Sequence, residues 1–274
     1  VGSDSVPRLA AREVAVPLAH TKSPITTYIN KDNSIKTEKR MELTLSKKPK
    51  GVTIVSGFPG FGLVGTIATG FLIDHLKCER IGNHWFEDMP ATLALHDGKI
   101  VDPVGFYYSK KYNLVLIHSI SGVTGIEWQA GDLVLRACKE LGAKELIAIE
   151  GVGSQKMDSQ RAFYYTTDPK NANVLAKNGV ESLKEGIIVG VTGAILLKAP
   201  VSLTCIFSET HTNLPDSKSA AKVIEVLDKY LGLDVDYRPL LKQAEEFETK
   251  VKGIMQKQAV AQDDTEKKNL NYIT

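Results

Sequence analysis

Short apolar runs alternate with amphipathic stretches from residue 52 onward, and this alternation is typical of a mostly parallel sheet with crossover helices. Helical periods fit at 62–77 and 127–141, and Gly142 follows the second as a C-terminal cap would. The unit from 115 to 149 predicts a right-handed strand–helix–strand crossover. The stretch 159–167 is expected as an inserted hairpin strand. Further strands are predicted at 52–56, 92–96, 104–108, 114–119, 146–150, 187–190 and 203–207.

Both ends of the chain depart from this pattern. The first 49 residues are polar and irregular, with four prolines. Met41 is a plausible initiator, and whether residues 1–40 are native stays open. Two helices are predicted near the other end, and the second is expected to pack on its own domain or to form a subunit contact. The predicted organisation is an irregular N-terminal extension at 1–49, one domain at 50–258 that ends in helices at 217–231 and 237–258, and a flexible tail at 259–274.

Composition narrows the class of protein. The 34 basic and 32 acidic residues nearly cancel, so nothing predicts the basic face of a nucleic-acid-binding protein. Apolar runs stop well short of the roughly 20 residues that span a membrane. The three cysteines, separated and odd in number, disfavour a disulfide framework and favour a reducing cytoplasm. No C-x-x-C or H-E-x-x-H pattern occurs, so we expect no metal site and no cofactor.

The strongest local signal is the glycine-rich loop between the first predicted strand and the first predicted helix. Such a loop exposes backbone amides at a helix N-terminus, where an anion is favoured. Three of its glycines match the dinucleotide-binding pattern G-x-G-x-x-G, and Glu87 follows at the distance of a ribose-binding acid. A proline and two phenylalanines disfavour a phosphate site, as does the polar segment 80–86 where a buried strand would be needed. We therefore favour close helix–sheet packing over dinucleotide binding. The loop comprises Gly57, Phe58, Pro59, Gly60, Phe61, Gly62 and, two residues on, Gly65.

Two strand ends carry candidate catalytic groups. Glu150 and His118 each end a predicted strand, at the sheet edge where α/β proteins bind ligands. An acid and a histidine there could act as an acid–base pair on a glycosidic bond, whereas the simpler interpretation is that they hydrogen-bond loops. Without a nucleophile motif or a basic phosphate grip, we expect no enzymatic activity and keep both residues as weak candidates.

Two stretches together resemble a known family. The glycine loop with the helix 66–74 is the first; the second is Ser208-Glu209-Thr210-His211, followed by Pro215-Asp216 and by 220–223. In this order they resemble the archaeal proteasome assembly chaperone family, the family of proteasome assembly chaperone 2 homologues. The resemblance covers roughly residues 50–258.

The resemblance implies a fold, a state and a partner. The expected fold is a three-layer α/β/α sandwich with a mostly parallel or mixed sheet, similar to nucleoside phosphorylases and hydrolases, plus C-terminal helices. The expected state is a homo-oligomer in the cytoplasm. The expected partner is the proteasome core particle or its α subunits. The alternative is a nucleoside phosphorylase/hydrolase-like enzyme or a small-ligand-binding protein.

The C-terminus provides a candidate docking segment. The resemblance brings a comparison with proteasome activators, which typically end in a hydrophobic residue, a tyrosine and one final residue, whereas here the tyrosine is third from the end. A sticky end on a flexible tether suits capture of a multivalent ring, and folding back onto the protein's own surface is the alternative. The candidate partner-binding residues are Leu270, Tyr272, Ile273 and Thr274.

Overall fold

The computed structural model describes most of the chain in two units, Val1–Leu43 and Thr44–Thr274. In the first unit, strands β1 (Ile25–Ile29) and β2 (Ile35–Lys39) pair antiparallel. Both strands contain β-branched residues, which suit a pleated surface, so the expectation of irregular structure throughout residues 1–49 was wrong. The described residues are 25–29, 35–39, 43–89, 93–96, 98–153, 161–199, 201–210 and 214–242.

A mixed sheet forms the centre of the second unit. Within the described part of the chain it has nine strands in the order β12-β11-β13-β10-β4-β9-β8-β5-β3. The four central strands β13, β10, β4 and β9 are parallel, and antiparallel pairs join β11, β8, β5 and β3 to them. The bounds are β3 (Thr44–Leu45), β4 (Thr53–Gly57), β5 (Glu79–His84), β8 (Val104–Ser109), β9 (Leu114–Ser119), β10 (Glu145–Gly153), β11 (Ala162–Thr166), β12 (Glu181–Ser182) and β13 (Ser202–Thr210).

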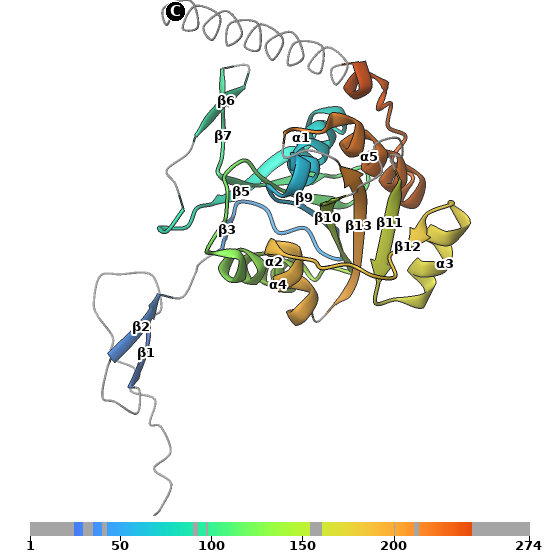
Figure 1. The fold of residues 1–274 in the computed structure, drawn as a ribbon. Helices are drawn as coiled ribbons and strands as arrows, with labels where there is room; N and C mark the ends of the chain where they lie inside the picture. Colours follow the sequence, from blue (N-terminus) through green and yellow to red (C-terminus); the bar gives the residue numbers. More distant parts are fainter. Residues whose placement is uncertain are drawn as a thin grey trace, which may run out of the picture. The chain divides into compact units, whose positions relative to one another are not determined.

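Helices cover both faces of this sheet (Figure 1). On one face α1 (Val64–His75) packs beside α5 (Ser217–Leu231); on the other α2 (Glu127–Leu141) packs beside α4 (Gly190–Lys198). The short helix α3 (Pro169–Lys177) packs near β11 and β12. The predicted three-layer α/β/α fold with a mixed sheet is therefore confirmed.

The core explains why the central strands could be predicted. All six residues of β9 are buried, because helices cover both of its faces, and buried strands read as continuous apolar runs. On the α1 and α5 face the core includes Leu72, Ile147, Ile206 and Leu227, each 0% exposed. Burying one such side chain stabilises the fold by about 2 kcal/mol relative to leaving it exposed.

Most predicted elements are present with shifts of a few residues. The strands expected at 52–56, 104–108, 114–119, 146–150 and 203–207 correspond to β4, β8, β9, β10 and β13. The helix expected at 127–141 is α2, and Gly142 caps it with a φ of 56°. The inserted strand is β11, and β9 and β10 are parallel as expected, with β4 between them.

Three element predictions need correction. The run 187–190 is a loop that leads into α4, because Gly190 with a φ of 74° reverses the chain where a strand was expected. The strand expected at 92–96 is β6 (Ala94–His96), which pairs with β7 (Lys99–Val101) in a separate hairpin. The extension at 1–49 reaches into the main sheet, since β3 pairs with β5. Of the helix expected at 237–258, residues 238–242 are helical and 243–258 lie outside the described residues.

Candidate functional site

The glycine loop, defined here as residues 57–65, connects β4 to α1 at the carboxyl edge of the parallel strands. A short 3-10 helix, η1 (Phe61–Leu63), precedes α1. Gly62 has a φ of 66° and Leu63 a φ of 51°, and a left-handed backbone at a leucine is strained. A Cβ at position 62 would also lie 2.6 Å from Oγ1 of Thr210. The loop is thus a tight turn built against the end of β13.

Two other glycines bring the helix into contact with the sheet. A Cβ on Gly57 would lie 2.2 Å from the carbonyl oxygen of Gly65, and a Cβ on Gly65 would lie 2.9 Å from the carbonyl oxygen of Ile149. Both distances are shorter than side-chain carbon atoms tolerate, so the first turn of α1 lies directly on β4 and β10. This contact is the close helix–sheet packing that the sequence favoured over a phosphate site.

The carboxylate of Glu150 lies against this loop. Its Oε1 is 1.9 Å from where a Cβ on Gly60 would stand. The hydroxyl of Thr192 on α4 donates to its Oε2 at 3.1 Å, and the backbone N–H groups of Phe61 and Gly151 donate to it as well. Burial raises the pKa of Glu150 to about 7, against these hydrogen bonds, which lower it. The Glu150 carboxylate therefore already occupies a backbone N–H that an anion bound at this helix N-terminus would need.

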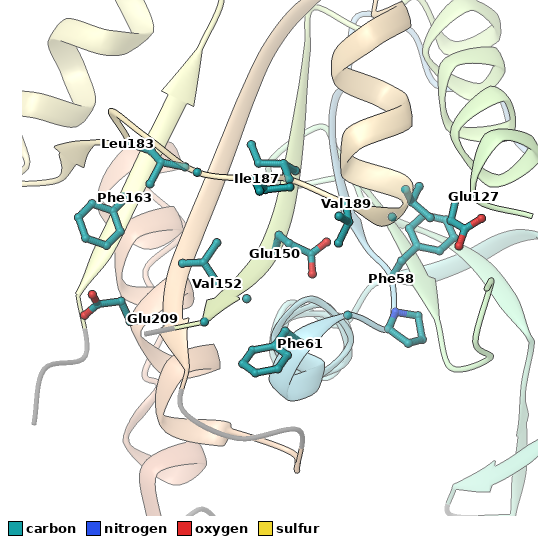
Figure 2. Close-up of a pocket in the computed structure, with 18 of the residues that line it drawn as sticks. Phe58, Phe61, Glu127, Glu150, Val152, Phe163, Leu183, Ile187, Val189 and Glu209 are labelled. Atoms are coloured by element: carbon teal, nitrogen blue, oxygen red, sulfur yellow. The ribbon is translucent and has the colours of Figure 1, made fainter. Parts of the chain in front are cut away.

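Glu150 also lines a cavity of about 960 Å³ at the carboxyl ends of β4 and β10. Figure 2 shows it between Phe58 and Phe61 of the glycine loop and Ile187 and Val189 of the loop before α4. The volume is in the range of small-molecule sites. The walls are largely apolar, and among the described residues that line the cavity there are five glutamates and one lysine, Lys184.

The histidine candidate lies on the opposite face of the sheet. In the parallel register His118 pairs with Gly57, which pairs with Ile149. Neighbouring positions along a strand point to opposite faces, so His118 shares the face of Ile149 and not that of Glu150. The side-chain contacts agree, because Nδ1 of His118 is 2.9 Å from Oγ1 of Thr69 on α1, whereas Glu150 binds Thr192 on α4. Burial lowers the pKa of His118 to about 4. The two candidates do not form an acid–base pair.

The strand after α1 bears on the dinucleotide alternative. In a dinucleotide-binding unit the second strand lies parallel beside the first. Here β5 is antiparallel to β8, and β9 and β8 separate it from β4. Glu87 follows β5 at that distant part of the sheet. The match to G-x-G-x-x-G therefore lacks its structural context.

The two stretches that carry the family resemblance meet in space. The backbone N–H of Asp216 donates to the carbonyl oxygen of Gly62 at 2.9 Å. The Asp216 carboxylate accepts the Thr210 hydroxyl at 2.7 Å and caps α5 by accepting the backbone N–H of Ser219 at 2.9 Å. Glu209 forms an ion pair with Arg161 at 3.0 Å. Hydrogen bonds thus join the glycine loop, the end of β13 and the start of α5. His211 lies outside the described residues.

A cluster of exposed apolar side chains lies beside the cavity. We define the α4 patch as Trp128, Ile187, Val189 and Leu197, which are 54%, 92%, 73% and 75% exposed. The sequence pattern predicts a strand at 187–190 and therefore does not indicate an exposed apolar patch there. The signal that could have found it is the stretch Gly190–Lys198, in which Thr192 and Lys198 alone are polar, since so apolar a helix has no side suited to water.

The remaining sequence-based expectations concern metal ligands, membrane helices, cysteines and the C-terminal tail. The described residues contain no group of three or more His, Cys, Asp and Glu side chains arranged to hold a metal. Among the described helices, none is both long and apolar enough to cross a membrane. The cysteines Cys78, Cys138 and Cys205 are free thiols. The candidate tail residues Leu270, Tyr272, Ile273 and Thr274 lie outside the described residues.

Comparison with known proteins finds a matching family, a related sequence and similar crystal structures. The profile of the PAC2 family matches residues 54–255. An uncharacterized protein of Methanocaldococcus jannaschii is 25% identical over 80% of this chain and 92% of its own length. The crystal structure of Pyrococcus furiosus PbaA, an archaeal homolog of proteasome-assembly chaperone, has a TM-score of 0.70 and 28% identity, covering 83% of this chain and 96% of that one. Pyrococcus furiosus PbaB, an archaeal proteasome activator, shares the fold with a TM-score of 0.66 at 20% identity, covering 78% of this chain and 98% of that one.

Proposed function

This chain belongs to the PAC2 family, and from that premise we propose that it is a cytoplasmic, proteasome assembly chaperone-like protein that acts by binding other proteins. The observation that carries the proposal is the likeness to PbaA, a homolog of proteasome-assembly chaperone, over 83% of this chain. The proposed partner is the proteasome core particle or its α subunits, and the proposed state is a homo-oligomer.

The geometry at the strand ends supports binding over catalysis. Glu150 and His118 point to opposite faces of the sheet, so neither can assist the other in proton transfer. The glycine loop is closed by Glu150 of the same chain, which disfavours an incoming phosphate at that helix N-terminus. The α4 patch, in contrast, presents large apolar side chains to solvent, which is typical of surfaces that bind proteins.

The C-terminal residues Leu270, Tyr272, Ile273 and Thr274 are proposed to dock on the core particle. The polar segment 262–268 before them is suited to act as a tether. A homo-oligomer would present several such tails at once, so each bound tail raises the effective concentration of the next.

Co-purification tests the proposal. The full chain is mixed with intact core particle and, separately, with isolated α subunits, and each mixture is passed over a sizing column. We expect a complex with one of the two, because an assembly chaperone has to recognise either the ring or its precursors. The absence of a complex in both mixtures, at concentrations well above 1 µM, would refute the proposed function.

A nucleoside phosphorylase/hydrolase-like enzyme or small-ligand-binding protein is the second candidate. The observation in its favour is the cavity of about 960 Å³ with Glu150, whose pKa of about 7 suits proton transfer. A panel of nucleosides with and without phosphate, followed by thermal shift and product release, tests it. Turnover of any nucleoside that is lost in Glu150→Gln would favour this candidate over the binding protein.

A further inference from the structure

The cavity beside Glu150 is bounded on one side by an irregular segment of the chain. We define the strap as residues 183–189, which join β12 to α4 and all line the cavity. At one end the backbone N–H of Leu183 donates to the carbonyl oxygen of Tyr164 at 2.8 Å, and at the other α4 begins directly. Within the described part of the chain, no backbone hydrogen bond holds residues 184–188. The strap can therefore adjust to the shape of a bound molecule.

Large apolar side chains of the cavity lining are exposed to solvent. Ile187 and Val189 of the strap are 92% and 73% exposed, and Phe61 of the glycine loop is 37% exposed. Figure 2 shows these three side chains around the carboxyl group of Glu150. A molecule with an apolar body would remove this surface from water, and that burial would stabilise it in the cavity.

The charged groups of the lining favour a cation over an anion. Glu209 is paired with Arg161, and Lys184 belongs to the strap. Even with Arg161 counted, five carboxyl groups face two cationic side chains, and such an excess of one sign attracts ions of the other sign. The glutamates of the lining are Glu127, Glu150, Glu181, Glu185 and Glu209.

The carboxylate of Glu150 can accept a further hydrogen bond. An ionised carboxylate has about four acceptor positions. Three donors of the described residues bind Glu150, namely the hydroxyl of Thr192 and the backbone N–H groups of Phe61 and Gly151. One position is therefore left for a donor from the cavity, and a charged donor forms a stronger hydrogen bond there than a neutral one.

We propose that the cavity binds a small organic cation, whose apolar body lies against the strap and Phe61 and whose ammonium group donates to the carboxylate of Glu150. This inference goes beyond the proposed binding of core-particle subunits. It names a ligand class for the cavity that the second candidate function leaves open. A compound that carries an aromatic body and a primary amine is the simplest probe.

Three compounds with one body and different charges provide the test. Phenylpropylamine, phenylpropanol and phenylpropionate are titrated into the full chain by calorimetry at about pH 8, where Glu150 is ionised because its pKa is about 7. The amine should bind at least tenfold more tightly than the carboxylate and at least threefold more tightly than the alcohol. Core particle is left out of these titrations, so their result and that of the co-purification are independent.

Two variants and a control locate the ligand. Glu150→Gln should bring the affinity of the amine down to that of the alcohol. Ile187→Ala, at a largely exposed position that should not affect folding, should weaken all three compounds at least twofold. Leu197→Ala is the matched control, since Leu197 is 75% exposed on α4 and lines the neighbouring hollow but not the cavity. It should bind all three compounds like the wild type.

Four results would overturn the proposal. The first is no binding of any of the three compounds up to about 10 mM. The second is equal affinity for amine, alcohol and carboxylate, which would show that the cavity does not recognise charge. The third is a folded Glu150→Gln variant that keeps the full preference for the amine. The fourth is a Leu197→Ala variant that loses as much affinity as Ile187→Ala, which would place the compounds on the outer side of α4.

Discussion

At the scale of single residues, Glu150 has the place in this loop that a phosphate has in nucleotide-binding proteins. It accepts the backbone N–H of Phe61 at the start of η1 and the hydroxyl of Thr192 from α4. It therefore joins three segments that are distant in the sequence. Gly57 and Gly65 make this arrangement possible, because any side chain there would separate α1 from the sheet.

Replacing Gly57 with alanine is expected to destabilise the fold by about 3 kcal/mol or more. The new Cβ would stand 2.2 Å from a backbone oxygen of Gly65, so the helix or the strand would have to move. Urea unfolding measures the change. Gly122→Ala is the control, since a Cβ there meets nothing within 4 Å, and it should stay within about 0.5 kcal/mol of the wild type. Equal stability of the two variants would contradict the close packing.

Replacing Glu150 with glutamine is expected to remove a pH-dependent part of the stability. The pKa of Glu150 is about 7 in the folded state against an ordinary value of 4.5. Between pH 4.5 and about pH 7 this carboxyl group is therefore protonated in the folded state and ionised in the unfolded state. The stability from the protonated form is thus fully present below about pH 4.5 and is lost by up to about 3 kcal/mol as the pH rises through 7. The free energy of unfolding of the wild type, minus that of Glu150→Gln, should fall by this amount between about pH 5 and pH 8.

Only the difference between the wild type and Glu150→Gln assigns this pH dependence to Glu150. The pKa values of His84 and His118 are lowered to about 4 by burial, so their contributions to stability rise with pH over part of the same range and oppose that of Glu150. Asp88→Asn, at an exposed position, controls for the removal of one surface carboxylate. A difference between wild type and Glu150→Gln that does not vary with pH would show that the carboxyl group has an ordinary pKa.

At the scale of elements, burial decides which predictions succeeded. Runs such as 114–119 and 146–150 are apolar because helices cover both faces of the sheet, so they could be recognised without knowing their neighbours. The run Ile187-Ile188-Val189 has the same composition but is exposed at two of its three residues, and a glycine with positive φ then starts a helix. Composition alone cannot distinguish a core strand from an exposed apolar loop.

The relative position of Glu150 and His118 could not be predicted from the sequence of either strand alone. Glu150 and His118 were expected at the ends of two strands, and they lie toward the carboxyl ends of β10 and β9, two parallel strands with β4 between them. Their faces depend on the register of β9 and β10 relative to β4, which backbone pairing sets between residues 61 positions apart for β9 and 92 positions apart for β10. The glycine loop was easier, because its steric requirement is local to the turn between β4 and α1.

The caps of α5 and α3 give a matched pair for a prediction on elements. Asp216 and Asp168 each accept a backbone N–H at the start of their helices, at 2.9 Å in both cases. Asp216 also accepts hydroxyl groups from Thr210 and Ser219. Asp168→Ala should cost about 1 kcal/mol, and Asp216→Ala about 2 kcal/mol. Chemical denaturation measures both, and an equal cost would mean that the two hydroxyl bonds contribute nothing net.

At the scale of the whole molecule, the C-terminal tail is proposed to dock on the core particle. Deleting residues 270–274 should weaken binding to an assembled core particle at least tenfold while the thermal midpoint stays unchanged, because the proposal gives these residues a role in docking and none in the stability of the domain. Surface-immobilised core particle gives the affinity. The substitution of Tyr272 and Ile273 by serine in the full-length chain is the control for length. Unchanged binding by both proteins would remove the tail from the mechanism.

The main sheet ends on both sides in a two-residue strand, β12 at one edge and β3 at the other. So short an edge offers few unpaired backbone groups to a strand of another molecule. Growth of the sheet by strand addition, the usual route to uncontrolled aggregation, is therefore disfavoured at either side. A protein proposed to bind unassembled subunits gains from this, since its own sheet edges offer those subunits few backbone groups to pair with.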